Sequence, residues 1–116
     1  MTTKDRDLDH PIIQNPWQYR ITGFSYKRSL ADSQDSYIDL TLQKDEVVRR
    51  LRFHRPQDIR LDEGFPECSG LFISDVRERR LEGLAVRVGD FEASPGGVWF
   101  WAHSVEDLDA HSDTKT

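Results

Sequence analysis

The segment SYIDLTLQ, Ser36 to Gln43, decides the fold class, because apolar and more polar side chains alternate along it without a break. Ile38, Leu40 and Leu42 share one parity, and the residues between them share the other. A strand with one buried face and one solvated face has this period of two. The segment therefore predicts a strand of an antiparallel sheet.

Similar patterns extend on both sides of this segment. The aromatic-rich stretch 17–28 contains Gly23, where a β-bulge is expected. Residues 45–55 have two interpretations, a short helix that Asp45 would cap or a strand that returns from a tight turn. The alternation through Phe53 and the early Pro56 favour the strand. Further strands are predicted at 59–61, 71–76, 84–88 and 98–104.

The patterns predict a mainly β fold. We expect a single curled antiparallel sheet or a flattened sandwich of six to seven strands, with at most one short helix. A chain of 116 residues is long enough for one core. A single domain at 12–105 is expected, between a flexible N-terminal tail at 1–11 and an acidic flexible C-terminal tail at 106–116, because both tails have little apolar content. The expected core is formed by Ile21, Phe24, Ile38, Leu40, Leu42, Leu51, Phe53, Ile59, Leu61, Leu71, Ile73, Leu84, Val86, Val88, Phe100 and Ala102.

Composition narrows the classes of function. The net charge of −5 disfavours non-specific attraction to nucleic acid or to anionic membranes. The single cysteine, Cys68, has no internal partner for a disulfide, which fits a reducing cytoplasm. The chain has no apolar run of the roughly 20 residues that a membrane helix needs. We therefore expect a soluble cytoplasmic protein without a membrane partner.

The last predicted strand, VWFWAHS, departs from the alternation rule. Phe100 and Ala102 have the parity of the core, so Trp99, Trp101 and His103 point to the face that should be wet. Either other parts of the chain cover this face, or the two tryptophans form an exposed patch that binds a partner or a second copy of the chain. A hairpin with the preceding strand would place Arg87 near them, where it would stack on tryptophan.

Arginines form a second candidate surface. Arg50, Arg52 and His54 share one parity of their strand and, with Arg87, could share a face with the tryptophans. Arginine interleaved with aromatic residues is typical of nucleic-acid binding. Cross-strand ion pairs with the many aspartates and glutamates are the stronger explanation of the arginines. Because the protein is acidic, nucleic acid is an unlikely partner.

Catalytic and metal-binding patterns are weak. The four histidines are scattered, with no pair at the spacing of metal ligands, so neither a metal site nor a cofactor is predicted. Cys68 lies in the loop segment GFPECSG and is interpreted as a small, partly buried residue; pairing with His103 has no motif to support it. We predict no catalytic residue, and an enzyme is the less favoured interpretation.

The segments DSYIDLTL, LRFHRPQDIRL, GLFISDV and RRLEGLAVRVGDFE, with the closing strand VWFWAHS, resemble small uncharacterised bacterial β-rich proteins, some of them described as immunity proteins. The resemblance implies a β-rich fold and protein binding, and it names no active-site residue. The favoured function is a non-enzymatic protein-interaction module of unknown partner, and the resemblance implies an immunity-like one. The alternatives are a small-molecule-binding protein or enzyme with a site inside the curled sheet, near His54, His103 or Cys68, and a nucleic-acid-binding protein that uses the arginine and tryptophan residues.

Overall fold

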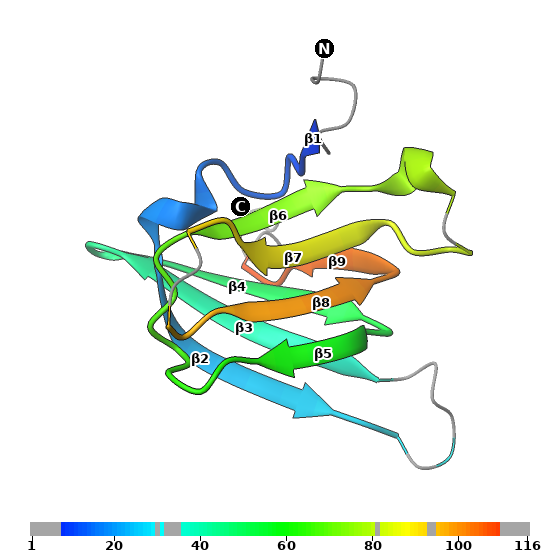
Figure 1. The fold of residues 1–116 in the computed structure, drawn as a ribbon, viewed down its shortest axis with the longest axis horizontal. Helices are drawn as coiled ribbons and strands as arrows, with labels where there is room; N and C mark the ends of the chain where they lie inside the picture. The colour runs from blue at the N-terminus through cyan, green and yellow to red at the C-terminus, as the bar shows by residue number, and fades with distance from the viewer. Residues whose placement is uncertain (1–7, 30, 32–35, 81, 93–94, 110–116) are drawn as a thin grey trace.

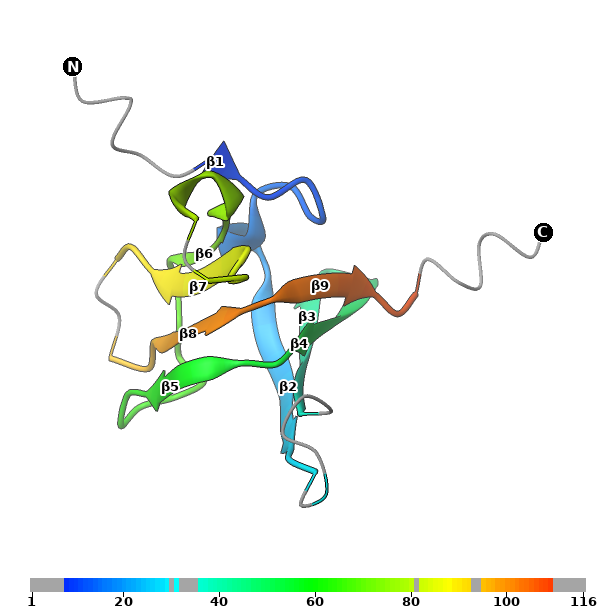
Figure 2. The ribbon, with the colours of Figure 1, turned by 90° about the vertical axis from the view of Figure 1, so that its right-hand side faces the viewer.

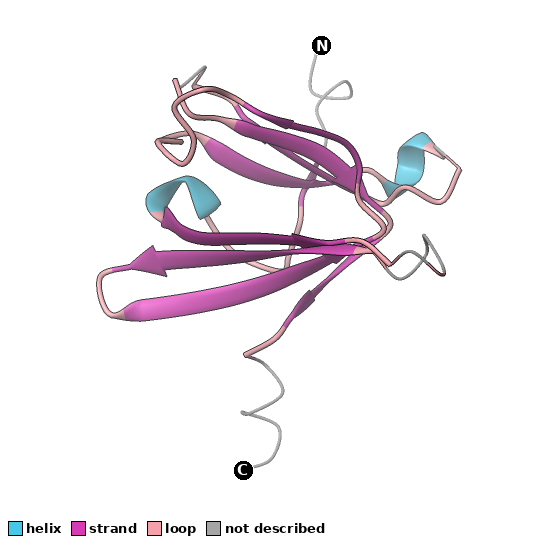
Figure 3. Ribbon diagram, turned by 90° about the horizontal axis from the view of Figure 1, so that it is seen from below, coloured by secondary structure: helices cyan, strands magenta, loops and turns pink. Residues whose placement is uncertain are grey.

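Nine antiparallel strands build the part of the chain that the computed structural model describes, residues 8–29, 31, 36–80, 82–92 and 95–109. The strands form two sheets that face each other (Figure 1 and Figure 3). Sheet A has the order β1 (Leu8–Asp9), β6 (Leu71–Asp75), β7 (Val86–Asp90), β8 (Val98–Ala102) and β5 (Gln57–Leu61). Sheet B has the order β2 (Arg20–Lys27), β3 (Tyr37–Lys44), β4 (Val47–His54) and β9 (Ser104–Asp107).

The mainly β, antiparallel class is confirmed, whereas a single sheet of six to seven strands is wrong. The two additional strands are β1, which lies in the predicted N-terminal tail, and β9, which forms where the last predicted strand ends. Two sheets form because the chain bends at two places and continues from one sheet into the other. The first bend separates β4 from β5 at Arg55, which has a positive φ of 53°, and the second separates β8 from β9 at His103. The two sheets therefore converge at one corner, on the right in Figure 3. The only helical structure among the described residues is two 3-10 turns, η2 (Pro16–Gln18) and η4 (Arg77–Arg79).

The pairing of β3 with its neighbours follows the predicted alternation. Ile38, Leu40 and Leu42 are completely buried. The register of β2 shifts between Ile21 and Gly23, which confirms the predicted bulge. Residues 47–54 form a strand paired with β3 along its whole length, so the strand interpretation of this segment is correct.

The core lies between the two sheets. Phe53 of sheet B meets Phe100 of sheet A edge to face, with ring centroids 5.0 Å apart, and neither side chain is exposed by more than 1%. Leu61 is wrongly assigned to the core, since 43% of it is exposed. It belongs to an edge strand whose pairing with β8 shifts between Gln57 and Arg60. Phe24, Ile59 and Leu84 are also only partly buried, and the buried apolar residues that the sequence prediction omits are Ile13, Cys68, Val76 and Val98.

Ordered pairing extends into both segments that the sequence predicts to be tails. At the N-terminal side, β1 pairs with β6, and the chain then crosses from sheet A to sheet B through residues 10–19. Ile13 is buried on this path, and Arg49 Nη2 donates to the carbonyl oxygen of Ile12 at 2.9 Å. At the C-terminal side, β9 pairs with β4 through Asp107. Residues 1–7 and 110–116 lie outside the described residues.

Candidate functional site

The outward face of sheet A carries the two tryptophans of β8. Val98, Phe100 and Ala102 are buried, and the alternate residues Trp99 and Trp101 therefore point away from the core and remain partly exposed. In Figure 1 this face is turned toward the reader, and in Figure 2 it forms the left side of the molecule. In neither view does a described strand or turn lie over it. Within the described residues, the structure therefore favours the open patch over a covered one.

Strand order brings further residues to this surface, which we call the aromatic–arginine face. Its members are Arg60 of β5, Phe72 of β6, Arg87 of β7, and Trp99 and Trp101 of β8. The Arg87 guanidinium carbon lies 5.1 Å from the ring centroid of Trp101, directly opposite it in the ladder, and 5.6 Å from that of Phe72. The predicted stacking of Arg87 on tryptophan is thus present.

Gly89 allows two rings to meet across β7. The rings of Phe72 and Trp99, on the strands that flank β7, are edge to face with centroids 6.3 Å apart. A Cβ atom on Gly89 would lie 2.5 Å from Cζ of Phe72 and 2.7 Å from Cε3 of Trp99. Such distances are far below ordinary contact, so these positions of the two rings depend on glycine here.

Trp99 is also held from the β5 side. The guanidinium carbon of Arg60 lies 4.8 Å from the Trp99 ring centroid, and Trp99 Nε1 donates to Asp62 Oδ2 at 3.3 Å. Asp62 Oδ1 in turn lies 3.3 Å from Arg60 Nε. The Trp99 ring therefore has contacts on both flanks, with Phe72 on one and with Arg60 and Asp62 on the other. These contacts hold the aromatic rings and the arginine side chains of the face in place.

Arg50, Arg52 and His54 lie on the outward face of sheet B, so the structure does not bring them to the tryptophans. Their strand pairs with β3 and β9 rather than with a strand of the tryptophan face. Arg52 forms a double contact with Asp39, at 2.7 and 2.9 Å, and this hydrogen bonding raises the pKa of Arg52. Arg50 pairs with Asp109 at 2.8 Å, and His54 Nε2 lies 2.7 Å from Glu106 Oε2. The ion-pair explanation therefore holds for Arg50 and Arg52.

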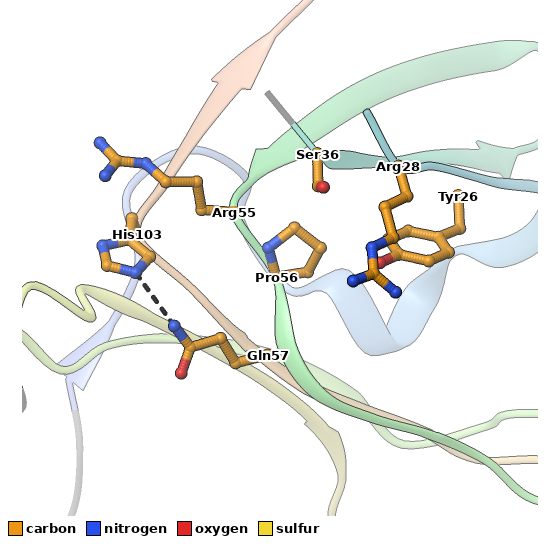
Figure 4. A pocket seen from close by; sticks show the side chains of 7 residues that line it. All are labelled: Tyr26, Arg28, Ser36, Arg55, Pro56, Gln57 and His103. Atoms are coloured by element: carbon orange, nitrogen blue, oxygen red, sulfur yellow. Dashed lines mark hydrogen bonds between the residues drawn. The ribbon is translucent and has the colours of Figure 1, made fainter. Parts of the chain in front are cut away.

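His103 lies at the corner where the sheets converge, and it lines a hollow of about 380 Å³ that we call the corner pocket (Figure 4). The lining residues are Tyr26, Arg28, Ser36, Arg55, Pro56, Gln57 and His103. The His103 backbone N–H donates to the carbonyl oxygen of His54 at 2.9 Å. Their rings nevertheless have different partners, since His103 Nε2 lies 3.3 Å from Gln57 Nε2, whereas the His54 ring contacts Glu106.

Cys68 has the environment of a structural thiol. Only 8% of the residue is exposed, and burial, with the nearby carboxylate of Asp90, raises the pKa of the thiol. A raised pKa disfavours the thiolate that acts as a nucleophile. Cys68 borders a hollow near Trp17 and Pro66, whereas His103 lines the corner pocket. Among the described residues, no group of three histidine, cysteine, aspartate or glutamate side chains is placed to hold a metal ion.

Comparisons with protein-family models, with curated proteins and with solved structures find no match to this chain. In the described part of the chain, no helix has the length and apolar character needed to cross a bilayer.

Sequence reasoning missed two members of the aromatic–arginine face, Arg60 and Phe72, and the neighbouring Asp62, which contacts Arg60 and Trp99. Phe72 has the opposite parity to its buried neighbours Leu71 and Ile73, which indicates an outward position. The sequence alone does not, however, specify that β6 and β5 flank the β7–β8 pair. That strand order is what gathers these residues around Trp99.

Proposed function

We propose that this chain is a non-enzymatic protein-interaction module that binds a partner protein on the aromatic–arginine face. The observation that carries the proposal is the placement of Trp99 and Trp101 on one face that no described strand or turn covers, each with a guanidinium carbon within 5.1 Å of its ring centroid. Tryptophan and arginine are the residues that most often dominate the binding energy of protein interfaces. Because the rings are already fixed, binding costs little side-chain entropy.

Charge indicates the chemistry of the partner. Arg60 and Arg87 place two guanidinium groups on this face of a protein whose net charge is −5, and Asp62 pairs with that of Arg60. A partner surface with apolar side chains flanked by carboxylates complements it, since the rings bury apolar groups and the guanidinium groups bind carboxylates. An immunity protein, which neutralises a toxin by binding to it, is one protein of this kind. The resemblance of the sequence to immunity-like proteins makes a toxin the first partner to test.

The alternatives receive less support. Single-stranded nucleic acid also stacks on aromatic rings beside arginines, but Arg50 and Arg52 lie on the other sheet and are paired with aspartates. They do not extend the positive charge of the aromatic–arginine face. An enzyme that uses Cys68 as a nucleophile is disfavoured by the burial of its thiol.

Capture experiments with three immobilised proteins test the proposal. We expect the wild type to retain a partner from cells of the source organism, Trp101→Ala to lose it, and Tyr37→Ala to keep it. Tyr37 is the matched control, because its ring is also stacked with an arginine, Arg52 at 3.9 Å, but on sheet B. Calorimetry with the purified partner should then show that Trp101→Ala weakens binding by tenfold or more, a loss of about 1.4 kcal/mol or greater.

Two results contradict the proposal. The first is equal capture by all three proteins, or capture by none of them. The second is a Trp101→Ala protein whose circular dichroism spectrum shows that it has unfolded, because the tryptophan would then be part of the core. The gene next to the one that encodes this chain is the most direct source of a candidate toxin.

A further inference from the structure

We infer a second binding site, separate from the aromatic–arginine face: the corner pocket binds a small ligand through an oxyanion, a phosphate or carboxylate group. The pocket of about 380 Å³ lies near the lower end of the range for small-molecule sites. It forms because β4 bends into β5 at Arg55, while the end of β2 and the residue before β3 supply the opposite wall. None of its lining residues belongs to the proposed docking face.

The lining consists of cations and neutral hydrogen-bond donors. Arg28 lies beside Tyr26 on one side of Pro56, Arg55 lies near His103 on the other side, and the Ser36 side chain lies between them (Figure 4). The hydroxyl groups of Tyr26 and Ser36 add donors, the Gln57 amide nitrogen contacts His103, and no described carboxylate lines the pocket. A carboxylate or phosphate fits this set of groups, and a cation does not.

The two arginines of the pocket, like Arg20 and Arg80, differ from five other described arginines in having no described carboxylate partner. Five described arginines form ion pairs with aspartates: Arg49, Arg50, Arg52, Arg60 and Arg77. Arg28 and Arg55 have no described carboxylate within 4.0 Å, although the protein is acidic overall. Arg28 and Arg55 line one hollow from opposite sides of Pro56, with the Arg55 guanidinium group pointing outward, and we take both arginines to be available to an external anion. The planar fork of each group matches the oxygens of phosphate and carboxylate.

The backbone at Arg55 gives an unusually clean test. Its φ of 53° lies in the left-handed region, which glycine adopts without steric cost. Arg55→Gly therefore removes the guanidinium group and keeps the bend, including the 2.8 Å hydrogen bond from the Arg55 N–H to the Ser36 carbonyl oxygen. Arg80 is the matched control, because it is exposed, has a φ of 57° and lies outside the pocket.

The experiment titrates the full chain with inorganic pyrophosphate and, separately, with citrate, at low salt. Binding is measured by calorimetry and located by amide chemical shifts in NMR spectra. We expect saturable binding of one or both anions, with shifts at Ser36, Gln57 and His103. Arg55→Gly and Arg28→Gln should each weaken it by about tenfold, and Arg80→Gly should leave it unchanged. Stronger binding of pyrophosphate identifies a phosphate ligand, and stronger binding of citrate a carboxylate ligand.

The proposal is overturned if neither anion binds saturably, or if Arg80→Gly weakens binding as much as Arg55→Gly does, since attraction to net charge would then be sufficient. Trp101→Ala should leave anion binding intact. This last comparison separates the pocket from the docking face, so that either proposal can fail without the other.

Discussion

Arg87 lies against the ring of Trp101, with its guanidinium carbon 5.1 Å from the ring centroid, and the two residues are directly opposite in the β7–β8 ladder. The contact thus follows from the register of the strands. The same guanidinium lies 5.6 Å from the centroid of Phe72 on β6. One side chain therefore joins three strands on the outward face of sheet A.

A double-mutant cycle measures the first of these contacts. We expect Arg87→Ala and Trp101→Ala to show a coupling of about 0.5–1 kcal/mol in the free energy of unfolding, the range for a cation over an exposed aromatic ring. Urea unfolding followed by far-ultraviolet circular dichroism gives the four values. A coupling of zero would mean that the two side chains do not interact in solution.

Gly89→Ala should separate the rings of Phe72 and Trp99, because the new methyl group lies 2.5 and 2.7 Å from their atoms. Overpacking of this kind costs about 1–3 kcal/mol. Gly23→Ala is the matched control on a strand of sheet B, where the nearest atom, Thr41 Oγ1, lies 3.0 Å away. We expect Gly23→Ala to have the smaller effect on the unfolding midpoint. Equal effects would contradict the close approach of the rings over Gly89.

Cys68 should react slowly with iodoacetamide in the folded protein at neutral pH. Burial keeps the thiol protonated and only 8% of the residue is exposed, so unfolding in urea should accelerate the reaction by more than tenfold. Mass spectrometry of the alkylated chain follows both rates. Rapid reaction of the native protein would indicate an activated thiol and would support the interpretation of the protein as an enzyme.

Asp109→Asn should loosen the end of the chain after β9. Asp109 accepts hydrogen bonds from the backbone N–H and the guanidinium group of Arg50, and the guanidinium bond lowers the pKa of the aspartate. We expect a loss of at most about 1 kcal/mol near neutral pH, because the pair is partly exposed. Amide hydrogen exchange at Leu108, whose N–H donates to the Arg50 carbonyl oxygen, should become faster.

The pH dependence of this pair has a defined sign. A lowered folded pKa means that the pair stabilises the fold fully above the ordinary aspartate pKa of about 3.9 and progressively loses this effect as the pH falls through the lower folded value. The stability difference between wild type and Asp109→Asn should therefore shrink below about pH 4. A difference that persists at lower pH would show that the asparagine disturbs something other than the charge.

Alternation along single strands was enough to predict much of this fold. Ile38, Leu40 and Leu42 are buried as their spacing indicates, and Gly23 marks a bulge. The two sheets were not predictable in the same way. Residues 98–104 look continuous in sequence, and the bend at His103 comes from the different partners that the chain has on either side of it. The edge-like strand predicted at 59–61, after Pro56, is present as β5, but the predicted burial of Leu61 on it is wrong.

The candidate site was predictable in part. The outward parity of Trp99 and Trp101, and the position of Arg87 beside them, followed from one hairpin. The structure does not place Arg52 beside the tryptophans, as the sequence suggested. Parity specifies the face of a strand on which a residue lies, but not which sheet that strand joins. The corner pocket combines Tyr26, Ser36 and His103, which are far apart in sequence, so no local motif could indicate it.

The two bends that join the sheets also constrain the order in which the chain folds. His54 pairs with Ser104, and Gln57 pairs with Trp101, partners that are about 50 positions apart in the chain. The hairpins β2–β3–β4 and β6–β7–β8 involve much shorter loops and lose less entropy on closing. Sequence separation therefore predicts that the corner assembles after these hairpins, and a chain that ends before β9 lacks the edge strand of sheet B but keeps the β4–β5 bend between the sheets.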